Sequence, residues 1–315
     1  SCIRVVVFAV VLLMGSLLVP HPAAAAKTIR FAFESGKTSL YGLTVTKFKE
    51  EVEKASTGAL KVNVFWGGSL AGGLEAIQMV KMGNCDMYMD VTAPVGNALF
   101  PKITVFDCPF IFTNLEHQSA VLQSPIMTDL VEEMVRATGV RILGSLPGHF
   151  RVIASTKEIK TAEDLKGFKI RSVQSAMDVA IWERLGALPV TLPWGEIYTS
   201  LATNMIGGLA AAPSSVVGGK FSEVCKYLIL SDHQAFIQLY LINDKFFQKL
   251  AKEEQKVLVD AMEKAREYCA ELGIKGTEEY PNPLAQAEKL GMTLVRPDKA
   301  AFEAALKGVE QRFIP

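Results

Sequence analysis

The sequence predicts an α/β fold built on open sheets, and three observations support this. Strand-like and helix-like segments alternate from residue 28 to residue 90. The alternation restarts near residue 140 and again runs strand, helix, strand. Glycines that favour turns stand between the segments. A repeated strand–helix–strand order is typical of mostly parallel sheets whose faces are covered by helices.

The first part of the chain is expected to form three strands joined by two helices. The helix after the first strand carries Val45, Phe48 and Val52 on one face, which is the spacing of an amphipathic helix. The expected strands cover 28–34, 60–65 and 86–90, and the expected helices 39–55 and 72–82.

The second part repeats this order and ends in a long helical pattern. In Thr161–Ile170, Thr161 and Asp164 have the spacing of a capping box and Gly167 stops the short helix, so a strand is expected to follow. Pro281 and Pro283 should break or kink the long helix. The expected strands cover 140–146, 168–173, 188–192, 207–213, 238–243 and 290–295, and the helices 175–185, 196–203, 252–279 and 300–309.

The charge of the chain is balanced, with 33 basic and 33 acidic residues. The segment 1–26 holds Arg4 and no acid, so the remainder carries 32 bases against 33 acids. A nucleic-acid partner would need a strongly basic face. We therefore expect none.

The N-terminus has the features of a secretory signal peptide. Arg4 precedes a short apolar run, and alanines occupy the positions before a cut after Ala26. The run is shorter than the roughly 20 residues of a spanning helix and is interrupted by Gly15 and Ser16. We expect residues 1–26 to be a cleaved signal and the mature protein to be periplasmic, with an uncleaved anchor as the alternative.

No sequence pattern indicates a metal site, a cofactor or catalysis. The remaining cysteines, Cys85, Cys108, Cys225 and Cys269, have no Cys-x-x-Cys spacing, and we expect most to be buried free thiols. The histidines are isolated, and there is no phosphate loop, dinucleotide fingerprint or nucleophile elbow. We expect no cofactor, no metal and no enzymatic activity.

The most informative position is Arg171, close to the end of the expected strand 168–173. In open α/β sheets, ligands bind at the carboxyl ends of the strands. A guanidinium at such a place can bind a carboxylate through two parallel hydrogen bonds. The alternative is that Arg171 is only a solvated charge at a strand end.

The downstream sequence favours the binding role. Glu163-Asp-Leu-Lys-Gly-Phe-Lys-Ile-Arg171 is followed by Leu185-Gly-Ala-Leu-Pro and by Pro193-Trp-Gly-Glu-Ile-Tyr-Thr. From about Lys27 to the C-terminus, the chain resembles the solute-binding proteins of tripartite ATP-independent periplasmic (TRAP) transporters. In that family the arginine at the position of Arg171 pairs with the carboxylate of the ligand.

The resemblance implies a two-lobed periplasmic binding protein with two open mixed sheets, hinge strands and a long helix spanning both lobes. The first lobe would comprise residues 27–147 and 236–276. The second lobe would comprise residues 148–235 and 277–315.

The resemblance also implies further ligand-binding residues. Arg151 matches a second carboxylate contact of the family, although it could instead form a hinge or an interlobe salt bridge. Glu34 and Asp90 follow the first and third expected strands, in loops 34–38 and 90–93, and would suit hydroxyl or amine groups; each could equally cap a helix or face solvent. Trp194 could form a wall of the pocket or wedge the start of a helix.

One departure from the family concerns Ala211. Many members carry an asparagine there that hydrogen-bonds the solute, whereas this chain has Gly207-Gly-Leu-Ala-Ala211. Losing that amide weakens selectivity for a matching polar group by about 1 kcal/mol or more. The change favours a less polar or differently sized carboxylate than sialic acid or a small dicarboxylate.

The sequence thus predicts an extracytoplasmic protein that captures a small carboxylate between two lobes and delivers it to a TRAP permease. Service to an ABC importer or a sensor kinase is an alternative on the same fold. A further alternative is an exported enzyme, although the sequence shows no pair of a nucleophile and a base.

Overall fold

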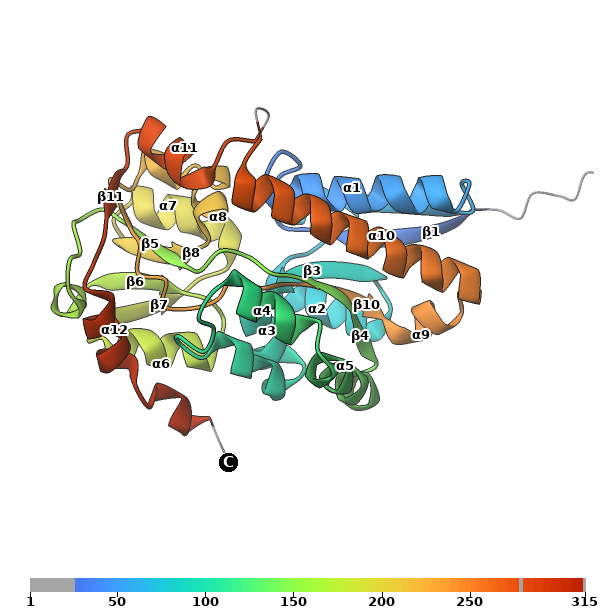
Figure 1. Cartoon of the computed structure of the whole chain (residues 1–315), viewed down its shortest axis with the longest axis horizontal. Helices are drawn as coiled ribbons and strands as arrows, with labels where there is room; N and C mark the ends of the chain where they lie inside the picture. Colours follow the sequence, from blue (N-terminus) through green and yellow to red (C-terminus); the bar gives the residue numbers. More distant parts are fainter. Residues whose placement is uncertain (1–25, 278–279, 314–315) are drawn as a thin grey trace, which may run out of the picture.

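The computed structural model describes residues 26–277 and 280–313, which form two sheets covered by helices (Figure 1). The expected signal peptide lies outside these residues apart from Ala26, so its cleavage remains a prediction. Within the described residues, no helix is long and apolar enough to cross a membrane.

The first sheet has five strands in the order β2-β1-β3-β10-β4. β1 pairs in parallel with β2 and β3, and β10 runs antiparallel to β3 and β4. The α/β expectation is therefore confirmed, with a mixed sheet. The strands are β1 (Lys27–Ala32), β2 (Leu60–Phe65), β3 (Met87–Val91), β10 (Gln238–Asn243) and β4 (Val140–Leu146).

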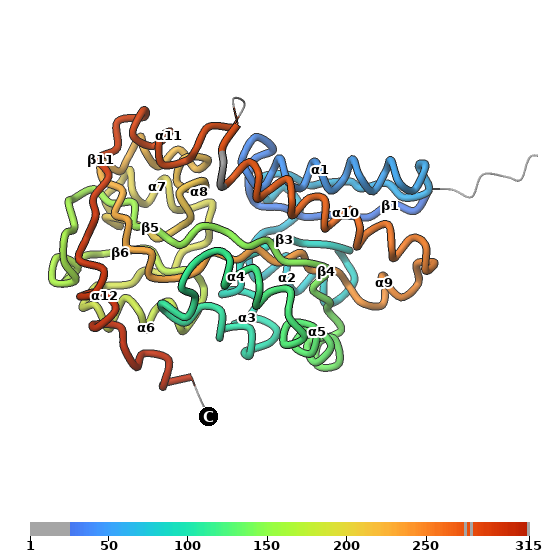
Figure 2. The backbone as a smooth tube through the Cα atoms, in the orientation of Figure 1, coloured from blue at the N-terminus to red at the C-terminus, as the bar shows by residue number. Residues whose placement is uncertain are grey.

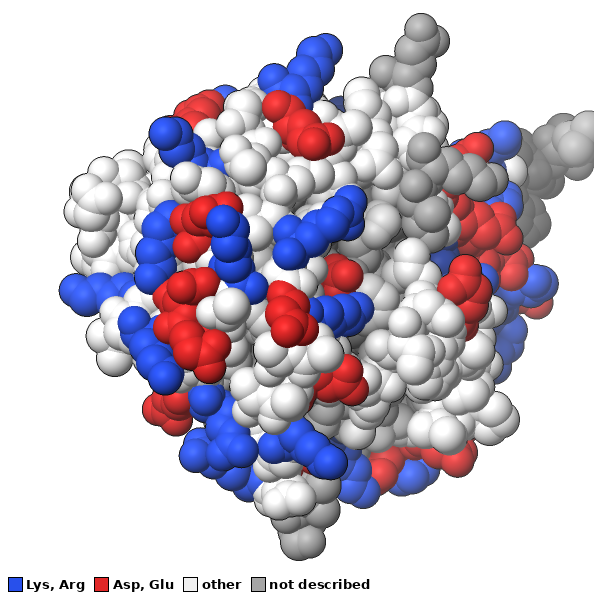
Figure 3. Space-filling view, turned by 60° about the vertical axis from the view of Figure 1, so that its left-hand side comes forward, with Lys and Arg blue, Asp and Glu red and all other residues white. Residues whose placement is uncertain are grey.

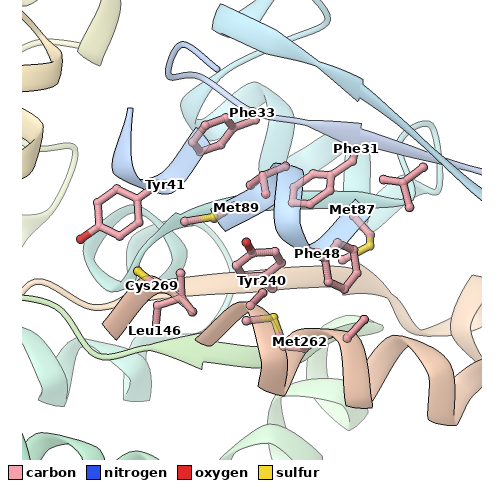
Figure 4. Close-up of a cluster of buried hydrophobic side chains, with 14 of the residues drawn as sticks. Phe31, Phe33, Tyr41, Phe48, Met87, Met89, Leu146, Tyr240, Met262 and Cys269 are labelled. Carbon is pink, nitrogen blue, oxygen red and sulfur yellow. The ribbon is translucent and has the colours of Figure 1, made fainter. Parts of the chain in front are cut away.

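Helices cover both faces of this sheet. One face carries α1 and α10, which lie side by side in Figure 1. Between them and the sheet, Phe31 packs edge-on against Phe48 and Tyr240, with ring centres 6.1 Å and 5.6 Å apart (Figure 4). The helices around this sheet are α1 (Leu40–Ala55), α2 (Gly73–Met82), α3 (Thr92–Ala98), α4 (Leu115–Leu122), α5 (Pro125–Thr138), α9 (Asp244–Gln248) and α10 (Lys252–Ala270).

The second sheet has six strands in the order β11-β9-β5-β8-β6-β7. β6 pairs in parallel with β7 and β8, whereas β5 runs antiparallel to β8 and β9. Its strands are β5 (Val152–Ser155), β6 (Lys169–Ser172), β7 (Leu188–Thr191), β8 (Gly208–Ala211), β9 (Tyr227–Ile229) and β11 (Thr293–Val295).

Two separate apolar clusters pack against the faces of this second sheet. One is centred on Trp182 of α6 and Phe302 of α12, and the other on Ile197 of α7 and Val216 of α8. The helices are α6 (Ala176–Arg184), α7 (Ile197–Ala202), α8 (Pro213–Gly218), α11 (Pro283–Lys289) and α12 (Lys299–Leu306). We call each sheet with its helices a lobe.

Short helical turns join several of these elements. Asp164 stabilises the start of one of these turns: its carboxylate accepts hydrogen bonds from the backbone N–H groups of Lys160 and Thr161, at 2.8 Å each. The turns are η1 (Trp66–Gly68), η2 (Pro101–Asp107), η3 (Ala162–Leu165), η4 (Trp194–Glu196), η5 (Phe221–Glu223), the π-helical η6 (Glu271–Lys275) and η7 (Val309–Arg312).

Two of the segments that cross between the lobes lie side by side, one before β5 and one before β10 (Figure 2), and the chain crosses again between α10 and α11. The backbone N–H of Arg151 donates to the carbonyl of Gln234 at 2.8 Å. Gly148 allows the close approach, since a Cβ there would lie 2.3 Å from the carbonyl oxygen of Phe236. The lobes also meet where α3 and η2 pack on α6 and where α1 packs on α8.

Two expectations about segments need correction. The long helix ends earlier than residue 279, because its α-helical part stops at Ala270 and Gly276 follows η6 with a φ of 71°, in the region that favours glycine. α10 packs on α1 and β4 of the first lobe. The turn η6 that follows α10 reaches the crossing segment before β5, where the Gly273 carbonyl lies 2.6 Å from His149 Nε2. The expected loop 90–93 does not form, since α3 begins at Thr92 directly after β3.

Candidate functional site

A cavity with about 80 Å³ of free volume lies between the lobes. All six residues expected to bind ligand line this cavity: Arg171, Arg151, Glu34, Asp90, Trp194 and Ala211. The first lobe contributes the two acids, from the carboxyl ends of β1 and β3. The second lobe and its crossing segment contribute the two arginines.

Arg171 lies in β6, between β7 and β8, with 7% of its surface exposed. Its Nε donates to the carbonyl of Leu192 at 3.0 Å. The pKa of Arg171 is lowered to about 10, mainly by burial; the charge of Asp178 opposes this shift and that of Arg151 adds to it. Because Nε is the only guanidinium atom with a partner among the described residues, the Nη1–Nη2 end can bind a ligand.

Arg151 immediately precedes β5, and 2% of its surface is exposed. Its Nη1 donates to the Ala210 carbonyl at 3.2 Å, and its guanidinium lies 5.0 Å from the ring centre of Phe236. Nε and Nη2, which form the side edge of the guanidinium, are buried without a hydrogen-bond partner in the described part of the chain. A buried charged group in this state is destabilising unless an anion reaches it.

Neither arginine forms an ion pair with a described residue. The alternative of an interlobe salt bridge for Arg151 therefore finds no support, although Arg151 does lie on the crossing segment. Asp107 is close enough for the charge of Arg151 to lower its pKa, but burial dominates and raises that pKa to about 7. His233 lies nearby, and burial followed by the charge of Arg151 lowers its pKa to about 3, so it is neutral.

Glu34 and Asp90 form a pair of acids on the other side of the cavity. Asp90 accepts hydrogen bonds from the backbone N–H of Val91 at 2.7 Å and from the Tyr88 hydroxyl at 3.1 Å. Burial raises the pKa of Asp90 to about 8, and the neighbouring charge of Glu34 adds to this rise. Burial also raises the pKa of Glu34, against the opposing effects of the Gly73 N–H and the charge of Arg171.

The remaining two expected residues shape the cavity. Trp194 is half-buried, and its ring packs edge-on against Phe221 at 5.3 Å, so it both borders the cavity and stabilises the turn that begins α7. Ala211 lies at the end of β8 and is buried. Its side chain is a single methyl group, so it fills less of the cavity than a larger residue would at this position.

Several polar or aromatic lining residues were missed by the sequence reasoning. Gln174 lies two residues after the end of β6, so the rule of strand ends that identified Arg171 could have found it. Gln238 begins the antiparallel β10, where that rule does not apply. Tyr41 and Phe236 stack with ring centres 5.7 Å apart, and only the folded chain brings them together.

The described residues contain no group of three or more histidine, cysteine or acidic side chains arranged to hold a metal ion. Most of the four cysteines were expected to be buried free thiols; all four are free, and Cys85, Cys225 and Cys269 are buried. Figure 3 shows Lys and Arg interspersed with Asp and Glu on the face drawn there. The site is a charged cavity between the lobes, lined by two arginines and two acids.

Two α/β lobes joined by crossing segments, with a charged cavity between them, define a two-lobed solute-binding protein. The family model "Bacterial extracellular solute-binding protein, family 7" matches residues 31–314. The chain belongs to this family. Its relatives and structural neighbours are the binding proteins of TRAP transporters, as the motifs around Arg171 predicted.

One relative is the 2,3-diketo-L-gulonate-binding periplasmic protein of Escherichia coli, which is 29% identical over 284 residues, 90% of this chain and 85% of the relative. The fold matches a TRAP solute-binding protein from Polaromonas bound to D-erythronate, with a TM-score of 0.85 and 27% identity over 91% of this chain and 94% of the other. It also matches one from Sulfurospirillum deleyianum bound to succinate, with a TM-score of 0.83 and 26% identity over 92% and 94%.

Proposed function

We propose that this protein binds a small organic acid between its lobes through Arg171 and Arg151 and delivers it to a TRAP permease in the cytoplasmic membrane. The observation that carries the proposal is the buried, unpartnered edge of Arg151 beside the free end of Arg171. Two guanidiniums at one cavity repel each other, and a carboxylate between them relieves this repulsion while satisfying their N–H groups.

The relatives support a carboxylate as the ligand class. The three proteins compared above are named for, or contain, a sugar acid or a dicarboxylic acid. They differ in the part of the ligand beyond the carboxylate. The shared feature is thus the carboxylate, for which this cavity supplies the two arginines.

Closure of the lobes would strengthen this binding. Removing water lowers the local dielectric and increases the attraction between the guanidiniums and the carboxylate. The ligand would stabilise the closed form by its higher affinity for that form. In this proposal Trp194 forms one wall, and the lobes divide near residues 147, 235 and 276.

The proposed role needs no catalysis, since capture and release suffice for transport. Export would follow from the predicted signal peptide of residues 1–26, and the family is extracellular. A periplasmic location and a permease partner are parts of the proposal.

Isothermal titration calorimetry with a panel of small carboxylates, including D-erythronate and succinate, tests the proposal. For the best ligand, Arg171→Ala should weaken binding by at least about 100-fold, since charge-assisted hydrogen bonds contribute about 1.5–3 kcal/mol each. Arg136→Ala is the matched control, because Arg136 is an exposed arginine outside the cavity. Unchanged affinity in Arg171→Ala would refute the role of Arg171.

A further inference from the structure

We infer that the ligand carries a single carboxylate and several hydroxyl groups, and that Glu34 and Asp90 select it by rejecting a second carboxylate. This inference rests on the proposed function, because it assumes that the ligand carboxylate binds at Arg171 and Arg151. It concerns the opposite side of the same cavity. Membership of the family does not decide the matter, since its solved members include a succinate complex as well as a sugar-acid complex.

The charges around the cavity leave no cation for a second carboxylate. Among the described lining residues, the basic side chains are Arg151 and Arg171, and the acidic side chains are Glu34 and Asp90. Two more carboxyl groups, Asp107 and Asp178, are close enough to interact with the arginines from behind the lining. A ligand with one carboxylate uses the available positive charge, whereas a second carboxylate would face only acids.

The two acids are held in place and cannot easily turn away from the cavity. Asp90 is fixed by Val91 N–H and by the Tyr88 hydroxyl, which itself accepts a hydrogen bond from Gly73 N–H at 2.9 Å. Glu34 packs directly on Gly72, where an added Cβ would lie 2.2 Å from its Oε1. Since the hydrogen bonds and packing fix these oxygens, they form a preorganised set of acceptors.

The protonation of the pair suits hydroxyl groups. Burial and the mutual repulsion of the two acids keep a proton on the pair at neutral pH, because the pKa of Asp90 is raised to about 8 and that of Glu34 is raised as well. A carboxylate accepts hydrogen bonds from ligand hydroxyls, and a protonated carboxyl can also donate one. Gln174 and Gln238 add amide donors and acceptors to the same cavity.

The size of the cavity points to a short acid. The cavity leaves about 80 Å³ for the centres of water-sized groups, so it suits a compact ligand better than a long one. A four-carbon hydroxy acid is such a compact ligand.

The test compares ligands that share a four-carbon backbone. Four-carbon aldonates (D- and L-erythronate, D- and L-threonate) carry one carboxylate and three hydroxyls, succinate carries two carboxylates, and butyrate carries one carboxylate without hydroxyls. Competition calorimetry at pH 7 should show the best aldonate binding at least 30-fold tighter than succinate and butyrate. If succinate or butyrate binds within threefold of the best aldonate, this inference is wrong while the proposed function stands. If no carboxylate binds, both are wrong.

Variants then test whether the two acids are responsible. Glu34→Gln should reduce the ratio of aldonate to succinate affinity at least tenfold at pH 7, because it removes the negative charge of the pair and keeps the shape of the side chain. Asp90→Asn replaces a carboxyl that is protonated at pH 7, so it should reduce this ratio at pH 9, where the wild-type carboxyl is charged. Glu163→Gln, a change at an exposed position in η3, should leave the ratio unchanged. Circular dichroism verifies folding. A ratio that stays constant in both cavity variants would overturn the selective role, whatever the wild type binds.

Discussion

The two sides of the cavity differ in charge and in how their charges are satisfied. The second lobe presents Arg151 and Arg171, whose guanidiniums have unused N–H groups. The first lobe presents Glu34 and Asp90, of which Asp90 is already hydrogen-bonded by Val91 and Tyr88. The arginine side therefore lacks an anion, whereas the acid side can accept hydrogen bonds from ligand hydroxyls and repels a second carboxylate. Affinity should come mainly from the arginines, and selectivity mainly from the acids.

The largest effect is expected from removing one of the two arginines of the cavity. Arg151→Met should weaken carboxylate binding by about 100-fold, since about 1.5–3 kcal/mol is attributed to each hydrogen bond with a charged group. The same change should stabilise the ligand-free protein by about 1–3 kcal/mol, because a buried, unpartnered charge is replaced by an apolar side chain. Calorimetry and urea unfolding measure the two effects, with Arg136→Met as control. If Arg151→Met bound the ligand as tightly as the wild type, the claim that affinity comes mainly from the arginines would be wrong.

A change of pH should act through the acid side. Above its pKa of about 8, Asp90 loses its proton and adds a negative charge to the cavity, where it interacts with Glu34, Tyr88 and Arg171. An added like charge in the same partly buried cavity costs on the order of 1–2 kcal/mol of binding free energy, so affinity should fall about tenfold between pH 7 and pH 9. Asp90→Asn should flatten this dependence. A pH-independent affinity in the wild type would show that the pair does not titrate near the ligand.

Removing the ring beneath Arg151 should have a smaller effect. The guanidinium of Arg151 lies over Phe236, which stacks on Tyr41 with the rings inclined by 25°. Phe236→Leu should lower affinity about three- to tenfold, since a cation–π contact contributes from about 0.5 kcal/mol at exposed sites to about 2 kcal/mol when desolvated, and leucine keeps part of the packing. Phe236→Tyr, which keeps the ring, should restore most of the loss. Failure of the tyrosine variant to restore binding would indicate a purely structural role for the residue.

The last expected effect concerns the stability of the ligand-free protein rather than its affinity. Because the folded-state pKa of Asp90 is raised above its ordinary value of 3.8, the folded protein loses stability as pH rises from about 4 to about 8. Asp90→Asn should therefore stabilise the ligand-free protein by about 1–2 kcal/mol at pH 8, with a smaller gain at pH 5. Denaturant unfolding at both values measures this. A larger gain at pH 5 than at pH 8 would have the wrong sign.

Much of the site could be predicted because strand ends are visible in the sequence. Arg171, Glu34 and Asp90 lie at or just beyond strands with clear alternation, and the structure brings all three to one cavity. Tyr88 was not predicted, because it lies within β3 and its hydroxyl contact with Gly73 joins residues 15 positions apart. That contact exists only once β3 and α2 have packed together.

The fold was predicted less well between residues 92 and 138. The sequence reasoning assigned no helices there, yet α3, α4 and α5 occupy most of this region. α5 carries ordinary end signals, with Pro125 at its start and Gly139 in the left-handed conformation after its end. α3 is short and apolar and contains Pro94, so its pattern does not distinguish a helix from a loop.

The most direct test of the central claim is a crystal structure of the protein with a bound four-carbon aldonate. We predict that the ligand carboxylate lies within about 3 Å of N–H groups of both Arg171 and Arg151, with hydroxyls hydrogen-bonded to Glu34 and Asp90. A ligand bound in the reverse orientation, or bound outside the cavity between the lobes, would contradict the account.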